Sequence, residues 1–146
     1  MIKIKRLYMN TVHLGLRVHW FIFRPNGHGV KILIEHEGKI LLARHNYGHK
    51  IWTIPGGGVK KNEEASLAAA REMQEEVGIS LSDVTWFGSY ESNYEHKKVV
   101  VDCYHSVVTN NFYKIDNFEL AEAQWFSLDD LPKDRVTSVD KIIKLY

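Results

Sequence analysis

One segment limits the folds open to this chain more than any other. It is PGGGVKKNEEASLAAAREMQEEVGI, which runs from Pro55 to Ile79. Three glycines after a proline predict a tight turn where the backbone can approach other groups closely. The alanine- and glutamate-rich stretch that follows predicts a helix, which Asn62 is expected to cap and Gly78 to end. The segment therefore predicts a glycine turn that leads directly into a helix.

The predicted helix has an acidic face and an apolar face. At about 100° per residue, Glu72, Glu75 and Glu76 fall within an arc of roughly 100°. The apolar side is predicted to consist of Leu67, Ala70, Met73 and Val77. Like charges at this spacing repel one another, so something should offset the cost. Carboxylate oxygens suit a hard cation such as Mg²⁺ or Mn²⁺, to which a turn carbonyl could add a ligand. A solvated acidic face is the alternative.

Size and charge narrow the function classes. With 146 residues the chain fits one domain that can bury a core. A formal net charge of +1 does not favour a nucleic-acid partner. Cys103 is the only cysteine and lies in the apolar run VVVDCYHSVV, so no internal disulfide can form and a buried, unreactive thiol is expected. No apolar run is long enough to span a bilayer, and we expect a cytoplasmic protein.

Residues 1–24 are predicted to form an amphipathic helix outside the main domain. Apolar residues recur there at helical spacing, and His13 and Arg17 interrupt the run, which argues against a signal peptide. Pro25 is expected to end the helix. We expect it to pack on the domain or on the partner of a homodimer, with contact at a membrane surface as the less favoured alternative. Residues 25–146 are predicted to form the main domain.

The other elements predict an α/β layered domain with a mixed sheet covered by helices. Strands are expected over 30–36, 39–44, 52–55, 83–92, 97–109 and 124–126. Glu37-Gly38 between the first two is a hairpin signal. A turn of helix is expected to start at 127–130, and a terminal helix to cover 138–146.

The spacing within the first segment resembles a family signature. Gly57 is followed by five residues and Glu63, and then by seven residues and the run REMQEEVGI (71–79). This pattern matches the Nudix box at every specified position. The flanking runs LLARHNYGHKIWTIPGGGV and EAQWFSLDDLP also look like those of the family. The chain is thus similar to Nudix hydrolases over about residues 29 to 132.

This resemblance implies the Nudix α/β/α sandwich with a mixed β-sheet. It also implies Mg²⁺-dependent hydrolysis of a diphosphate linkage in a small nucleoside diphosphate derivative, with the metal neutralising charge and positioning water. Glu72, Glu75 and Glu76 would be the metal ligands, and the Gly56 carbonyl could add another. Glu72 is the first choice among these carboxylates for deprotonating water.

Four further positions take roles from the resemblance. Arg71 and Glu63 look like the family's orienting pair, which holds the carboxylates. Some family members place the general base on a loop before the closing tryptophan. Glu119 and Glu122 are the candidates for that position here, each with a surface charge as its alternative, and the sequence does not choose between them.

The sequence contains only weak indications of a particular substrate. Tyr94 lies sixteen residues beyond Gly78, near the tyrosine of the family's diadenosine-polyphosphate hydrolases. Arg44 could meet phosphate. A turn aromatic is the favoured alternative for Tyr94, and a solvated basic loop explains Arg44 at least as well. The sequence leaves two alternatives to an enzyme: a non-catalytic nucleotide-binding or sensing module, and an interaction protein recruited to membrane by its N-terminal helix.

Overall fold

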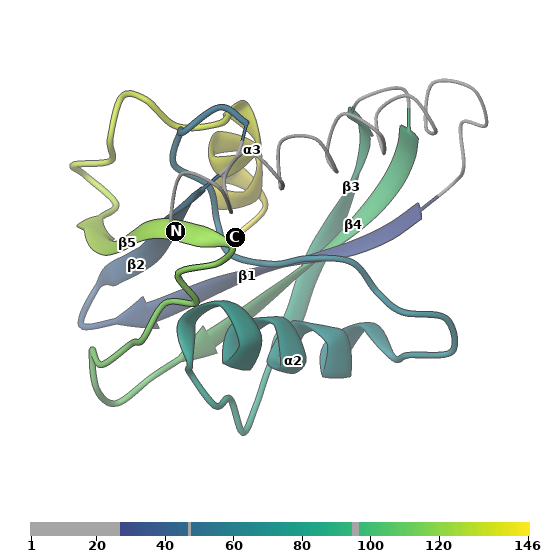
Figure 1. The fold of residues 1–146 in the computed structure, drawn as a ribbon, viewed down its shortest axis with the longest axis horizontal. Helices are drawn as coiled ribbons and strands as arrows, with labels where there is room; N and C mark the ends of the chain where they lie inside the picture. The colour runs from purple at the N-terminus through teal and green to yellow at the C-terminus, as the bar shows by residue number, and fades with distance from the viewer. Residues whose placement is uncertain (1–26, 47, 95–96) are drawn as a thin grey trace.

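A five-stranded mixed sheet forms the centre of the computed structural model, which describes residues 27–46, 48–94 and 97–146. The strands are β1 (Gly27–His36), β2 (Lys39–His45), β3 (Thr85–Tyr94), β4 (Lys97–Val107) and β5 (Leu120–Ser127). Their order across the sheet is β3-β4-β1-β2-β5 (Figure 1). β1 and β4 are parallel, and the other neighbouring pairs are antiparallel. The predicted mixed sheet is confirmed, whereas the predicted helix over 1–24 lies outside the described residues.

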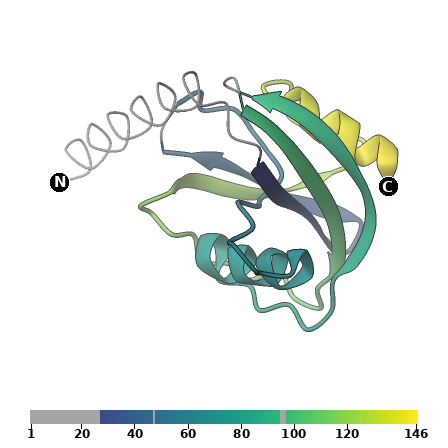
Figure 2. The same cartoon turned by 90° about the vertical axis from the view of Figure 1, so that its right-hand side faces the viewer.

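Two helices cover opposite faces of this sheet (Figures 1 and 2). α2 (Ala65–Val77) covers a core that includes Ile32 of β1 and Tyr104 of β4. α3 (Thr137–Leu145) covers a second core that includes Leu33 and Cys103. Consecutive residues of a strand point to opposite faces, so β1 supplies side chains to both cores. The result is the predicted α/β/α sandwich. Neither described helix is long and apolar enough to cross a membrane.

The turns at Glu37-Gly38 and Gly78 follow the sequence prediction. Glu37 and Gly38 both have positive φ, at 47° and 72°, and join β1 to β2 as a tight hairpin. Gly78 has a φ of 66° and its amide donates to the carbonyl of Met73, which ends α2 in a left-handed cap.

The start and the orientation of α2 differ from the prediction. Asn62 adopts a φ of 64° in the preceding turn, and Glu64 is the N-cap residue, without a side-chain capping bond. Leu67 is 62% exposed, so it does not belong to the buried face. The buried side consists of Ala68, Ala69, Met73, Glu76 and Val77. The helix is therefore rotated toward its acidic side, because Glu76 finds a buried hydrogen-bond donor in the glycine turn.

Three further predicted elements differ from the structure. Residues 52–55 form only isolated bridges, with Thr53 pairing to Ala43 of β2. β5 begins at Leu120 rather than at 124, because Leu120 and Ala123 are buried in the core under α2. The segment after Ser127 is a turn and not a helix.

Candidate active site

The glycine turn is fixed against β1. The Val30 amide donates to the Gly57 carbonyl at 2.9 Å, and the Ile32 amide donates to the Pro55 carbonyl at 3.0 Å. Gly56 between these bonds has a φ of 148°, and a β-carbon there would lie 2.1 Å from the Val30 carbonyl oxygen. Only glycine fits this position, because any side chain would collide with backbone.

Two glutamates of α2 contact this turn. The Gly56 amide donates to Glu76 Oε2 at 3.1 Å. A β-carbon on Gly57 would lie 2.4 Å from Glu72 Cδ, so the Glu72 carboxylate sits directly on the Gly57 backbone. The sequence predicted a glycine turn directly before the helix, and these two carboxylates are where the helix contacts that turn.

Glu76 is buried inside this contact. It is 3% exposed, and burial raises its pKa to about 7, because a carboxylate removed from water favours its neutral form. The positive charge of Lys31 and the hydrogen bond from Gly56 act in the opposite direction. The predicted acidic face is therefore not uniformly solvated.

Arg71 holds the other acidic side chains. Its guanidinium contacts Glu63 at 2.7 Å, Glu72 at 2.7 Å and Glu75 at 3.0 Å, and it donates to the Gly58 carbonyl at 2.9 Å. The hydrogen bond from Arg71 lowers the pKa of Glu63 to about 2. The hydrogen bonds to Glu63 and Glu72 in turn raise the pKa of Arg71. Arg71 thus offsets much of the repulsion expected among the glutamates of α2.

The structure distinguishes the surroundings of Glu119 from those of Glu122. Burial raises the pKa of Glu119, and the negative charges of Glu72, Asp116 and Glu75 raise it further. The loop of Glu119 is bonded to α2, because the Asp116 amide donates to the Glu76 carbonyl at 2.9 Å and the Glu119 amide donates to the Asp116 carbonyl at 3.1 Å. Glu122 is half exposed and faces Arg44 at 3.7 Å.

Asn46 fixes the loop that carries Glu119, and the sequence did not single it out. Its backbone amide donates to the Glu119 carbonyl at 2.8 Å. Its side-chain amide donates to the carbonyls of Asn117 at 2.7 Å and Leu120 at 2.9 Å. An asparagine just after a strand was the only available signal, and it is common to many turns.

Lys31 was also missed. Its ammonium donates to the Ile54 carbonyl at 2.7 Å, just before the glycine turn. The signal available in the sequence was one lysine within the otherwise apolar start of the run VKILI.

The two predicted substrate contacts, Arg44 and Tyr94, lie on β2 and β3 and not on the glycine turn or α2. Arg44 contacts Asp134 at 2.5 Å, and its guanidinium carbon lies 4.3 Å from the Trp52 ring centroid. Tyr94 is the last residue of β3 and pairs with Lys97 of β4. β4 separates β3 from β1, the strand that supports the glycine turn.

The oxygen atoms around the turn are of the type that binds a hard divalent cation. In this structure they do not point at one common position. The side chains supply carboxylate oxygen, the ligand that Mg²⁺ and Mn²⁺ prefer. The Gly56 carbonyl accepts no hydrogen bond from a described backbone amide, so it could add another oxygen. Glu72 and Glu75 are instead turned to Arg71. Within the described ranges, no three acidic, histidine or cysteine side chains form a ready metal-binding group. Arg71 bonds to Oε1 of Glu72 and to Oε2 of Glu75, so the second oxygen of each carboxylate could still bind a cation.

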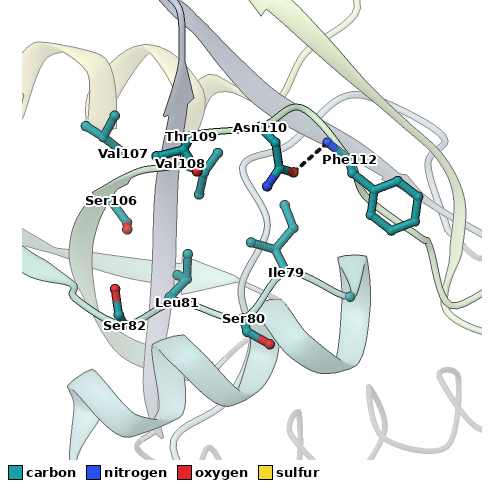
Figure 3. A pocket seen from close by; sticks show the side chains of 11 residues that line it. Ile79, Ser80, Leu81, Ser82, Ser106, Val107, Val108, Thr109, Asn110 and Phe112 are labelled. Atoms are coloured by element: carbon teal, nitrogen blue, oxygen red, sulfur yellow. Dashed lines mark hydrogen bonds between the residues drawn. The ribbon is translucent and has the colours of Figure 1, made fainter.

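A cavity of about 360 Å³ lies beyond the C-terminal end of α2 (Figure 3). Residues 78–82 form one side, and residues 106–110 with Phe112 form the other. Its lining contains hydroxyl and apolar side chains and none of the predicted site residues. This cavity is separate from the glycine turn and its carboxylates.

Cys103 is buried, as expected. Burial raises its pKa to about 11, and the nearby charge of Asp102 adds to that shift. A thiol with such a pKa is almost entirely protonated at neutral pH, so it is a poor nucleophile.

Known proteins resemble both the sequence and the fold. An RNA pyrophosphohydrolase of Teredinibacter turnerae is 47% identical over 62 residues, which are 42% of this chain and 35% of that protein. The NAD-capped RNA hydrolase NudC of Vibrio atlanticus is 31% identical over 103 residues, or 69% of this chain and 37% of that protein. This chain thus spans little more than a third of either relative.

The structural likeness covers more of the molecule. The MutT protein of Methanosarcina mazei Go1 superposes with a TM-score of 0.74 and 26% identity, over 84% of this chain and 93% of that one. The protein-family model for the NUDIX domain matches residues 25–146 of this chain. By that match, which covers most of its length, this chain belongs to the Nudix family.

Proposed function

We propose that this protein hydrolyses a diphosphate linkage in a nucleoside diphosphate derivative and uses Mg²⁺, or Mn²⁺ in its place. The observation that carries the proposal is the contact of two carboxylates with one glycine turn. Glu72 packs on Gly57, and Glu76 accepts the Gly56 amide. Similar proteins are named an RNA pyrophosphohydrolase and an NAD-capped RNA hydrolase, and these names support a hydrolytic reaction.

Each residue of the site then has a defined task. Glu72, Glu75 and Glu76 would hold the cation, with the Gly56 carbonyl as a further ligand. Bound there, the cation would neutralise phosphate charge and polarise the linkage. Arg71 and Glu63 act as positioning residues, because their ion pair fixes Arg71 beside both Glu72 and Glu75.

We propose Glu119 as the general base, in preference to Glu122 and to Glu72. A base must accept a proton from water, and the raised pKa of Glu119 makes its carboxylate a stronger proton acceptor than an ordinary glutamate. Water would attack one phosphorus atom as its proton passes to a Glu119 carboxylate oxygen, and the bond from that phosphorus to the bridging oxygen would break. Glu119→Gln should therefore lower kcat about 100-fold or more, whereas Glu122→Gln should stay close to the wild type. Equal losses in the two variants would argue against this choice.

The experiment that tests the reaction is a hydrolysis screen with Mg²⁺. It should include nucleoside triphosphates, dinucleoside polyphosphates, ADP-ribose and nucleotide sugars. It should also include RNA bearing a 5′-triphosphate or an NAD cap, because similar proteins are named an RNA pyrophosphohydrolase and an NAD-capped RNA hydrolase. Mg²⁺-dependent turnover of at least one compound is expected, and a small nucleotide is favoured by the net charge of +1. No turnover across the screen would contradict the proposal.

One observation favours the alternative of a nucleotide-binding module without turnover. Glu72 and Glu75 already share an ionic partner in Arg71, which could keep them from a metal. Thermal melting distinguishes an enzyme from a binding module. An enzyme of this kind should be stabilised by a slowly hydrolysed nucleotide analogue together with Mg²⁺, and much less by that analogue with a chelator. Equal stabilisation with and without metal would support the binding module.

The remaining proposals concern location and assembly. We propose a cytoplasmic protein whose domain covers residues 25–146. A homodimer, and contact of residues 1–24 with a membrane surface, stay predictions. Arg44 and Tyr94 stay proposed substrate contacts, and Arg44 would have to exchange Asp134 for phosphate to act as one.

A further inference from the structure

Lys31 places a cation beside the glycine turn. It lies on β1 between Val30 and Ile32, the two residues whose amides hold the carbonyls of Gly57 and Pro55. A β-carbon on Gly56 would lie 2.9 Å from the Lys31 Cα atom. The lysine backbone is therefore packed against the same turn that contacts Glu72 and Glu76.

The ammonium of Lys31 has unused hydrogen-bonding capacity. It makes one short bond, to the Ile54 carbonyl at 2.7 Å, and one long contact, to Thr53 Oγ1 at 3.5 Å. An ammonium group carries three donors, and Lys31 forms no ion pair with another residue in the part of the chain that the structure describes. Its third donor is therefore available to a further acceptor.

Holding this cation in a partly buried position has an energetic cost. Burial lowers the pKa of Lys31, and the charges of Glu76 and Glu72 only partly oppose that effect. A partly buried charge without an ion pair is costly, and an apolar side chain of similar volume is often neutral or better at such a position. A purely structural role would be served by methionine, so the cation calls for another explanation.

The charge of the proposed substrate supplies one. The diphosphate linkage and the three glutamates that would hold the cation together carry more negative charge than a single divalent cation neutralises. Glu72, Glu75 and Glu76 would be occupied with the cation, and they offer the substrate no positive charge. Lys31 stands at the same turn and offers both a charge and a free donor.

We infer that Lys31 is a substrate-contacting residue that donates its free N–H to a non-bridging oxygen of the diphosphate. The inference rests on the proposed function and identifies which side chain of this protein recognises the phosphate group. The bond to the Ile54 carbonyl already holds the ammonium next to the start of the turn.

The test compares Lys31→Met with Lys31→Arg and with Lys39→Met, an exposed lysine of β2 that serves as the matched control. Steady-state kinetics use the best substrate of the screen, calorimetry measures binding of inorganic pyrophosphate with Mg²⁺, and thermal melting measures stability. A charge-assisted hydrogen bond corresponds to about a tenfold change or more in binding. Lys31→Met should raise KM and weaken pyrophosphate binding by about that factor, with an unchanged or higher Tm.

The controls make the outcome decisive. Lys31→Arg should recover most of the affinity, because it restores a charged donor, and Lys39→Met should behave as wild type. Wild-type KM and pyrophosphate affinity in Lys31→Met would overturn the inference while leaving the proposed function intact. A parallel loss of Tm and affinity in both Lys31 variants would overturn it in favour of a structural role. A wild-type protein that hydrolyses nothing would instead contradict the proposed function itself.

Discussion

The carboxylate of Glu72 occupies the space that a side chain would need at Gly57. Glu72 Cδ lies 2.4 Å, and both of its oxygens 2.5 Å, from the point where a β-carbon on Gly57 would stand. Two residues fifteen positions apart are thus in direct contact, and the identity of one depends on the position of the other. Glycine at this site provides space for a carboxylate.

Gly57→Ala should therefore impair activity without unfolding the protein. The added methyl group would push the Glu72 carboxylate aside, and a displacement of about 1 Å in a reacting site can cost roughly 100-fold in rate. Stability should change by less than about 1 kcal/mol, because the end of a flexible side chain can move. Gly58→Ala is the control, since a β-carbon there meets nothing within 4 Å. Equal activity of the two variants in a kcat/KM assay would contradict this prediction.

Glu75→Gln and Glu76→Gln should each remove turnover while leaving the fold intact, because each keeps the shape of the side chain and loses its charge. Glu76→Gln should also raise the stability of the metal-free protein at neutral pH. It removes a charge from a buried site, where ionised carboxylates are costly. Circular dichroism, urea unfolding and the hydrolysis assay would check these effects, with the exposed Glu91→Gln as control. Wild-type turnover in either variant would remove that residue from the proposed metal site.

Glu63 should make the stability depend on acid pH. The folded protein holds the pKa of Glu63 near 2, below its ordinary value of 4.5, through Arg71 and the Lys60 amide. A lowered pKa means that this contribution is complete above about pH 4.5 and is lost as the pH falls toward 2. Urea unfolding between these values should show a smaller loss for Glu63→Gln than for wild type. Identical pH profiles would show that the ion pair with Arg71 adds nothing to stability.

Cys103 should react slowly with alkylating reagents in the native protein. The thiol is buried, and its pKa of about 11 leaves almost no thiolate at neutral pH. Mass spectrometry after iodoacetamide treatment should find little modification without denaturant and full modification with it. Rapid labelling of the native protein would mean that the core around β4 opens readily.

The sequence by itself determined the main elements and their chemistry. Periodicity and turn residues placed β1, β2, β3, β4, α2 and α3, because a strand or helix is encoded by residues close together in the chain. The spacing of Gly57, Glu63 and the run 71–79 identified the acidic group for the same reason. Boundaries failed where distant partners decide them. β5 extends back to Leu120 because β2 offers edge hydrogen bonds there.

Only the tertiary structure decided how the acidic residues divide their tasks. Helical spacing grouped Glu72, Glu75 and Glu76 on one face, yet packing buried Glu76 against Gly56 and left Glu75 exposed at Arg71. Glu119 and Glu122 were equivalent in the sequence, and the fold of the loop at Asn46 brought Glu119 toward α2. The position of Lys31 beside the glycine turn also became clear only from the fold, because β1 and the turn meet only in the folded chain. Burial and charge depend on neighbours across the sheet, so no local pattern can encode them.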